Sequence, residues 1–187
     1  MKRIGLSLLV LLCAASAAAA APGKFDACSL LTHKEIEEVQ GDRVASEKGS
    51  EPQSEPFAVS QCFYSLATFS RSISLEVTRR GPGKSESPRA RWKQMFFRAM
   101  EKGKEKEEEE RSGERGDRER AREAAARPRR VSGVGDEAYW DGSTLGGGLF
   151  VLKRDAYFRL SVGGPDNEAA KIEKLKKLAR RILTRLP

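Results

Sequence analysis

Histidine is almost absent from this chain of 187 residues, in which His33 is the single example. Cysteine is scarce as well, with three residues, so the side chains that most often bind transition metals are few. A Ser-His-Asp triad would have to use His33, and the sequence contains no G-x-S-x-G motif that would supply the nucleophile. We therefore expect no catalytic residue, no metal site and no cofactor, and a protein that is not an enzyme.

Long apolar runs are also missing, except for one near the start of the chain. The pair Lys2-Arg3 precedes an apolar run over residues 4–12, and alanine-rich sequence follows. This is the layout of a secretory signal peptide, and the run is too short for a stable membrane span. Cleavage after Ala20 is favoured, because a cut one residue later would leave proline at the new N-terminus. We expect residues 1–20 to be removed and the protein to be exported to the periplasm or beyond; an uncleaved anchor or a buried helix is the alternative.

The three cysteines divide between this leader and the rest of the chain. Cys13 follows the apolar run, but Leu12 stands where a lipoprotein signal has a small residue, so we do not expect a lipid anchor at Cys13. Removal of residues 1–20 leaves Cys28 and Cys62. An even number of cysteines in an oxidising compartment indicates a disulfide, with two separate buried thiols as the alternative.

The first part of the mature chain has the pattern of a short helix followed by a hairpin. Thr32 and Glu35 form an S/T-x-x-E capping box and Gly41 is a helix stop, which predicts a helix over about residues 33–40. A polar loop is expected over residues 46–56. After it, QCFYSLATF is rich in β-forming residues and SISLEVT alternates between apolar and polar residues, which predicts two paired strands with one solvated face.

A helix and a highly charged segment come next. A helix that faces the core is predicted in SPRARWKQMFFRAMEKG, because apolar residues recur there at helical spacing: Trp92, Phe96, Ala99 and Met100. Residues 101–130 mix acidic and basic residues and contain no Val, Ile, Leu, Met, Phe, Tyr or Trp. Such a segment has nothing to bury, so we interpret it as a disordered or frayed-helix insertion within a single domain over 21–187. A docking segment for a charged partner is the alternative.

The end of the chain returns to regular patterns. GLFVLKR and YFRLSV predict a second hairpin that turns at Asp155-Ala156, and Asp166 or Asn167 can cap a closing helix. The apolar stripe of that helix consists of Ile172, Leu175, Leu178, Ala179, Ile182 and Leu186. Two hairpin–helix units result, at about 57–102 and 139–186, with no residue-level repeat between them. We predict an α+β fold, a two-layer sandwich in which helices cover one face of an antiparallel sheet.

The stretch GVGDEAYW, residues 133–140, contains the G-x-G-x-x-A spacing of dinucleotide-binding loops. Such a loop needs a strand before it and a helix that begins within it, because the phosphate binds at the N-terminus of that helix. YWDGSTLGGG follows here and cannot form a helix of any length. We interpret the stretch as a turn whose glycines supply positive φ or a close backbone approach.

Two clusters of charge remain as candidate sites. Asp136, Glu137 and Asp141 lie close together, but they lack the D-x-D-x-D-G spacing of calcium loops, so a solvated turn is favoured over a carboxylate-based active site. The closing helix carries the basic residues Lys171, Lys174, Lys176, Lys177, Arg180, Arg181 and Arg185. A basic amphipathic helix can bind an anionic membrane or wall surface, whereas the favoured interpretation packs its apolar stripe on the sheet. We expect no nucleic-acid partner for an exported protein, despite a formal net charge of +8.

Four short motifs resemble an uncharacterised family of bacterial cell-envelope domains, best known from actinobacterial lipoproteins. They are Cys28-Ser29-Leu30-Leu31-Thr32 before a helix, Cys62 with an aromatic residue after it, residues 133–138 before a hairpin, and the closing amphipathic helix. The resemblance spans most of residues 25–186 and implies an extracytoplasmic α+β domain with paired cysteines. It implies no activity. We therefore expect a non-enzymatic envelope protein that binds a partner protein or a small ligand.

Overall fold

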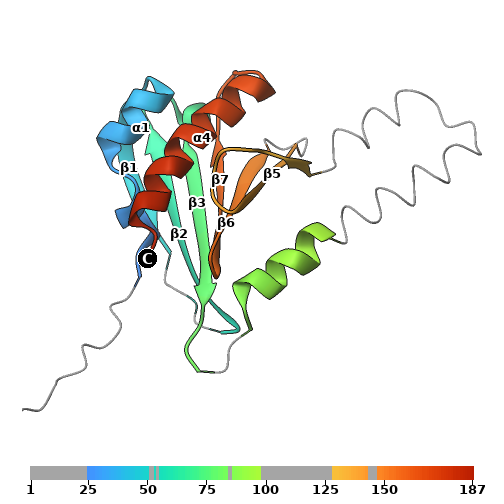
Figure 1. The fold of residues 1–187 in the computed structure, drawn as a ribbon. Coiled ribbons are helices and arrows are strands. Elements are labelled where there is room, and N and C mark those ends of the chain that lie inside the picture. The colour runs from blue at the N-terminus through green and yellow to red at the C-terminus, as the bar shows by residue number, and fades with distance from the viewer. Residues whose placement is uncertain (1–24, 51–52, 54, 84–85, 98–127, 143–146) are drawn as a thin grey trace, which may run out of the picture.

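The computed structural model describes residues 25–50, 53, 55–83, 86–97, 128–142 and 147–187. Within them the chain has a mixed α+β fold built on a seven-stranded antiparallel sheet, in the order β1-β2-β3-β7-β6-β5-β4 (Figure 1). The strands are β1 Val44–Gly49, β2 Phe57–Leu66, β3 Ile73–Arg80, β4 Arg129–Arg130, β5 Glu137–Asp141, β6 Gly148–Lys153 and β7 Ala156–Val162. The helices are η1 Ala27–Leu30, α1 His33–Gln40, η2 Phe69–Arg71, a helix over residues 88–97, and α4 Glu168–Arg185.

The helix α1 begins and ends where the sequence predicts. The Thr32 hydroxyl accepts a hydrogen bond from the backbone N–H of Glu35, and the Glu35 carboxylate accepts one from the backbone N–H of Thr32, so both halves of the capping box are present. Gly41 ends the helix in the left-handed region, with φ at 68°. The sequence signals for this helix are therefore confirmed at both ends.

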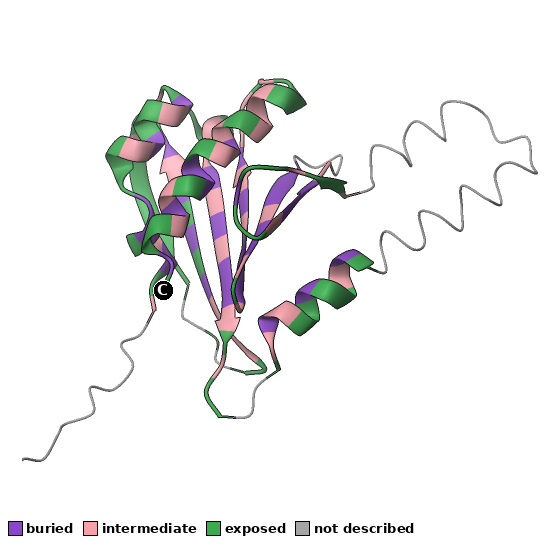
Figure 2. Cartoon of the chain, viewed as in Figure 1, coloured by how far each residue is buried: buried purple, intermediate pink, exposed green. Residues whose placement is uncertain are grey.

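One face of the sheet packs against η1, α1 and α4, and these elements form the larger core. Figure 1 shows α1 and α4 on the same side of the sheet, and Figure 2 shows the outward sides of both helices exposed. The strands contribute alternate residues to this face, such as Leu75 from β3 and Leu160 from β7, both buried. The buried residues of α4 are Leu175, Leu178, Ala179 and Ile182. We call this side of the sheet the covered face.

The helix over residues 88–97 packs on the opposite side of the sheet. Its Trp92 and Phe96 form a second, smaller core with Tyr139, Leu152 and Tyr157. The ring centroids of Phe96 and Tyr139 are 4.5 Å apart in a stacked arrangement. Helices therefore lie on both sides of the sheet, and the prediction of a two-layer sandwich with one covered face does not describe this end of the molecule. The reason is that β5, β6 and β7 present apolar residues on both of their faces.

Three local predictions also need correction. The polar loop expected over residues 46–56 begins as strand β1, because backbone pairing with β2 needs no apolar side chain at the edge of a sheet. Arg129 and Arg130, assigned to the charged insertion, form β4 beside β5. The second hairpin turns at Arg154-Asp155, one residue earlier than predicted.

Several predictions fall outside the described residues. They are the signal peptide, Cys13, and the part of the charged insertion up to residue 127. In the part of the chain that is described, no helix combines the length and the apolar character that a membrane crossing requires.

Candidate functional site

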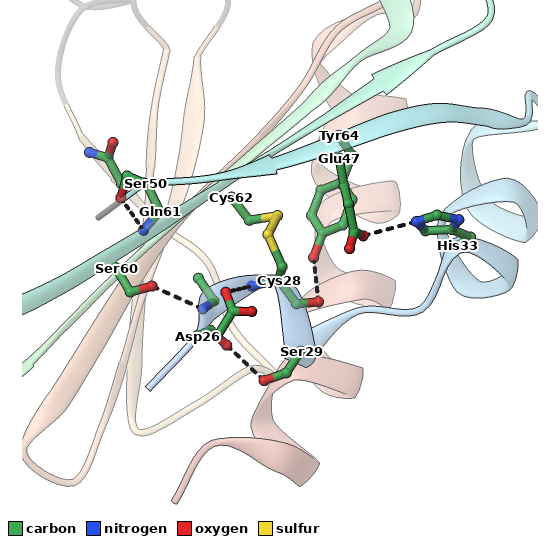
Figure 3. Close-up of a disulfide and its surroundings, with 11 residues drawn as sticks. Asp26, Cys28, Ser29, His33, Glu47, Ser50, Ser60, Gln61, Cys62 and Tyr64 are labelled. Atoms are coloured by element: carbon green, nitrogen blue, oxygen red, sulfur yellow. Dashed lines mark hydrogen bonds and ion pairs between the residues drawn. A yellow bond between two sulfur atoms is a disulfide. The ribbon is translucent and has the colours of Figure 1, made fainter. Parts of the chain in front are cut away.

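Cys28 and Cys62 are joined, with their sulfur atoms 2.01 Å apart, in agreement with the pairing expected from the sequence (Figure 3). The bond ties η1 to β2, and hydrogen bonds flank it. The backbone N–H of Ala27 donates to the Ser60 hydroxyl at 3.0 Å, and the Tyr64 hydroxyl donates to the carbonyl of Cys28 at 3.1 Å. Burial raises the pKa of the Tyr64 phenol, so this donor keeps its proton. The disulfide is thus part of the core architecture.

Among the described residues, His33 pairs with a carboxylate. Its Nε2 atom lies 2.9 Å from a carboxylate oxygen of Glu47 on β1, and 52% of the side chain is exposed (Figure 3). The pair joins the start of α1 to the edge strand at the surface. Such an exposed pair contributes little stability.

Asp136 and Glu137, which the sequence groups with Asp141 in an acidic cluster, both contact the helix over residues 88–97. Asp136 accepts hydrogen bonds from the backbone N–H of Arg154 and from the side chains of Lys153 and Arg89, which lower its pKa. Glu137 accepts one from the indole N–H of Trp92. Asp136 and Glu137 therefore hold the helix over residues 88–97 against the sheet. Among the described residues, no three His, Cys, Asp or Glu side chains converge as a metal site requires.

The glycines of GVGDEAYW serve a turn, as predicted. Gly133 and Gly135 have φ values of 83° and 62°. A Cβ atom on Gly135 would lie 2.5 Å from the carbonyl oxygen of Leu152, so only glycine fits between the turn and β6. Strand β5 follows the turn where a dinucleotide site would need a helix.

Four of the seven basic residues of α4 pair with neighbouring carboxylates. Lys174 contacts Asp166 at 2.7 Å, and Lys176 contacts Glu173 at 2.9 Å. Arg181 pairs with Glu38. Arg185 pairs with Glu35 through two hydrogen bonds of 2.7 Å. The apolar stripe packs on the sheet, and Lys177 and Arg180 remain exposed on the outer side of the helix.

A groove of about 430 Å³ lies on the side of the sheet opposite α1 and α4, beyond the end covered by residues 88–97. It runs across four strands, with Lys48 contributed by β1, Phe63 by β2, Glu76 by β3 and Arg159 by β7. Three strand spacings of about 4.8 Å give it a width of about 14 Å. The further lining residues are Gly49, Ser50, Gln61, Cys62, Ser74 and Leu75. We call this surface the open-face groove.

Cross-strand register explains which side chains meet in the groove. Lys48, Phe63 and Ser74 are successive register partners on β1, β2 and β3, so they point to the same side of the sheet. Gln61 and Glu76 are partners in the next row, where the amide N–H of Gln61 donates to Glu76 at 2.6 Å. The floor of the groove is therefore polar, with one exposed aromatic ring.

Arg159 forms one end of the groove. Glu76 is its register partner on β3, yet the guanidinium lies over β6 instead, 5.6 Å from the centre of the Phe150 ring. Gly148 makes this position possible, since a Cβ atom there would lie 2.9 Å from Nε of Arg159. Within the described part of the chain, no carboxylate or carbonyl accepts a hydrogen bond from this guanidinium.

Phe63 is the apolar element of the groove. Its side chain is 40% exposed, and its ring centre lies 6.1 Å from that of Phe69 in η2, which is 71% exposed. Adjacent exposed aromatic rings mark contact surfaces more often than isolated ones do. The sequence had placed Ser74 and Glu76 on the solvated face of their strand. It did not reveal Arg159 as their neighbour, because the pairing of β3 with β7 joins distant segments.

The groove offers a cation, hydrogen-bonding groups and an aromatic surface in one place. This combination can bind a ligand and orient it. Comparison of the chain with protein-family models, with curated proteins and with solved structures finds no match.

Proposed function

We propose that the protein is an exported, non-enzymatic domain of the cell envelope that binds a partner protein or a small ligand in the open-face groove. The observation that carries the proposal is the groove itself, which combines Arg159, Phe63 and the Gln61–Glu76 pair on a part of the sheet that no helix of the described residues covers. Its volume of about 430 Å³ lies within the range of small-molecule sites.

Export through a cleaved signal peptide over residues 1–20, without a lipid at Cys13, is the second part of the proposal. The joined pair of Cys28 and Cys62 supports it, because disulfides persist mainly in oxidising compartments. Closing a loop of this length stabilises a fold by about 3–4 kcal/mol in the chain-entropy model.

Peptide mapping of the protein recovered from the envelope tests the export part. We expect a mature N-terminus at Ala21 and a single cross-linked peptide pair that contains Cys28 and Cys62. An intact leader, or two cysteines that both react with an alkylating reagent before reduction, would contradict this part of the proposal.

A ligand-observed NMR screen tests the groove. We expect members of a mixed set of aromatic acids, amides and amines to bind the exported protein, and the substitution Ser74→Phe to abolish binding because it fills the groove beside Phe63. Lys177→Phe, on the exposed side of α4, is the matched control and should leave binding intact. Equal binding by the wild type and Ser74→Phe would show that the ligands bind elsewhere.

A further inference from the structure

The end of the groove at Arg159 has the composition of an anion-binding site. A guanidinium is a planar fork of N–H donors that matches a carboxylate in two parallel hydrogen bonds. Arg159 is half-buried and lies against Gly148 and Phe150, so its plane is held by packing rather than by an acceptor. A group held in this way loses little conformational freedom when a ligand binds.

Glu76, the one carboxylate in the groove lining, does not pair with the guanidinium of Arg159. Glu76 is directed to Gln61, whose amide N–H donates to it at 2.6 Å, and no ion pair joins Glu76 to Arg159 within the described residues. Lys48 adds a second positive charge at the β1 end of the groove. The positive side chains of the lining therefore outnumber the negative one, and the groove complements an anion.

The apolar part of the groove lies some distance from Arg159. The backbones of Phe63 on β2 and Arg159 on β7 are two strand spacings apart, which corresponds to about 10 Å, and the guanidinium lies over β6, one strand further from Phe63. A ligand that contacts both side chains must be elongated. It must present an oxyanion at one end and an apolar group at the other.

We propose that the open-face groove binds an elongated carboxylate, with Arg159 holding the carboxylate and Phe63 contacting the apolar end. This inference rests on the proposed function and adds the chemical class of the ligand. The carboxylate can belong to a free acid or to the C-terminus of a peptide, since both present the same group to the guanidinium.

Matched acids and amides test the inference in protein-observed NMR titrations. The probes are 6-phenylhexanoate, its neutral amide, and the shorter phenylacetate; a second arm uses the peptide Ac-Phe-Gly-Gly as free acid and as amide. We expect 6-phenylhexanoate to bind at least about tenfold more tightly than its amide, because the amide loses a charge-assisted pair of hydrogen bonds. It should also bind more tightly than phenylacetate, which cannot reach from Arg159 to Phe63.

The peptide arm identifies the source of the carboxylate. Tighter binding of 6-phenylhexanoate indicates a free acid, and tighter binding of Ac-Phe-Gly-Gly indicates the C-terminus of a peptide.

Variants in the groove give the inference an independent readout. Arg159→Gln should remove the preference for the acid over the amide. Arg159→Lys should restore only part of it, because an ammonium cannot form two parallel hydrogen bonds with a carboxylate. Glu76→Gln should increase the affinity for the acid, since it removes the one negative charge in the groove lining. Thermal unfolding of each variant verifies that it folds.

The outcomes separate this inference from the proposed function. If acid and amide bind in the groove with equal affinity, or if Arg159→Gln preserves the preference, the inference is wrong and the proposed function stands. If none of these probes and no member of the aromatic screen perturbs groove residues, both are wrong.

Discussion

Single carboxylates hold distant segments of this protein together, and Glu35 is the most tightly bound of them. Both of its oxygens accept hydrogen bonds from Arg185 at 2.7 Å, and one also accepts the backbone N–H of Thr32. The Arg185 hydrogen bonds, chiefly, lower the pKa of Glu35 from 4.5 to about 2, and its side chain is 16% exposed. This ion pair joins the first helix to the last, beside the pair of Glu38 and Arg181.

Glu35→Gln measures the contribution of this ion pair. The glutamine retains the capping hydrogen bond but loses the charge, so we expect a loss of about 1–2 kcal/mol in the free energy of unfolding at pH 7. Because the folded pKa is depressed, the stabilisation is complete above pH 4.5 and is lost as the pH falls toward 2. Urea unfolding at pH 7 and pH 3 should show a smaller difference between wild type and variant at pH 3.

Glu173→Gln is the control for this experiment. Glu173 pairs with Lys176 on the exposed surface of α4, and we expect no measurable change in stability from its substitution. A difference for Glu35→Gln that stays constant between pH 7 and pH 3 would contradict the assignment of the effect to the Glu35 charge.

At the scale of elements, the turn before β5 and the helix over residues 88–97 are locked to the β6–β7 hairpin. Asp155 accepts hydrogen bonds from Ser87, from the backbone N–H of Arg89 and from Arg80. Burial raises the pKa of Asp155, but these hydrogen bonds outweigh it and the pKa is lowered. The helix is therefore fixed at its start by polar contacts and along its length by Trp92 and Phe96.

Substitution of Gly135 tests the close approach of the turn to β6. Gly135→Ala places a methyl group against the backbone carbonyl of Leu152 at positive φ, and we expect a loss of about 3 kcal/mol or more. Gly41→Ala is the matched control, because Gly41 also has positive φ but nothing lies within 4 Å of its Cβ position. It should cost about 1 kcal/mol. Equal losses in chemical unfolding would refute the steric argument.

The edge strand β1 is protected against pairing with other strands. Its register shifts between Val44 and Ser46, and it carries the charged pair Glu47 and Lys48. Irregular register and charged side chains disfavour the addition of a further strand. For this reason we place the binding site on the open face and not along this edge.

At the scale of the whole molecule, the features that could be predicted from the sequence are those that depend only on residues close together in the chain. The capping box at Thr32, the alternation in SISLEVT and the turn glycines act within a few positions, so they could be recognised and are confirmed. The order of the strands could not be predicted, because it depends on contacts such as that between Leu75 and Leu160 across the molecule. The sequence also could not predict on which face of the sheet the helix over residues 88–97 packs. The apolar Trp92 indicates that one side of the helix is buried, but it does not indicate against which face.

The candidate site likewise contains residues that the sequence could place and residues that it could not. Alternation placed Ser74 and Glu76 on a solvated face, as the structure has them. Arg159 becomes notable once β7 lies beside β3 and Gly148 makes space for its guanidinium. A groove across four strands is a property of the assembled sheet, not of any one segment.

The central claim is that ligands bind in the open-face groove, and a map of backbone amide shifts during titration with 6-phenylhexanoate tests it most directly. We predict that the saturating shifts cluster at Lys48, Gln61, Phe63, Ser74, Glu76 and Arg159, and that Ser74→Phe removes them. Shifts that cluster instead on the exposed side of α4, or that persist in Ser74→Phe, would contradict the claim.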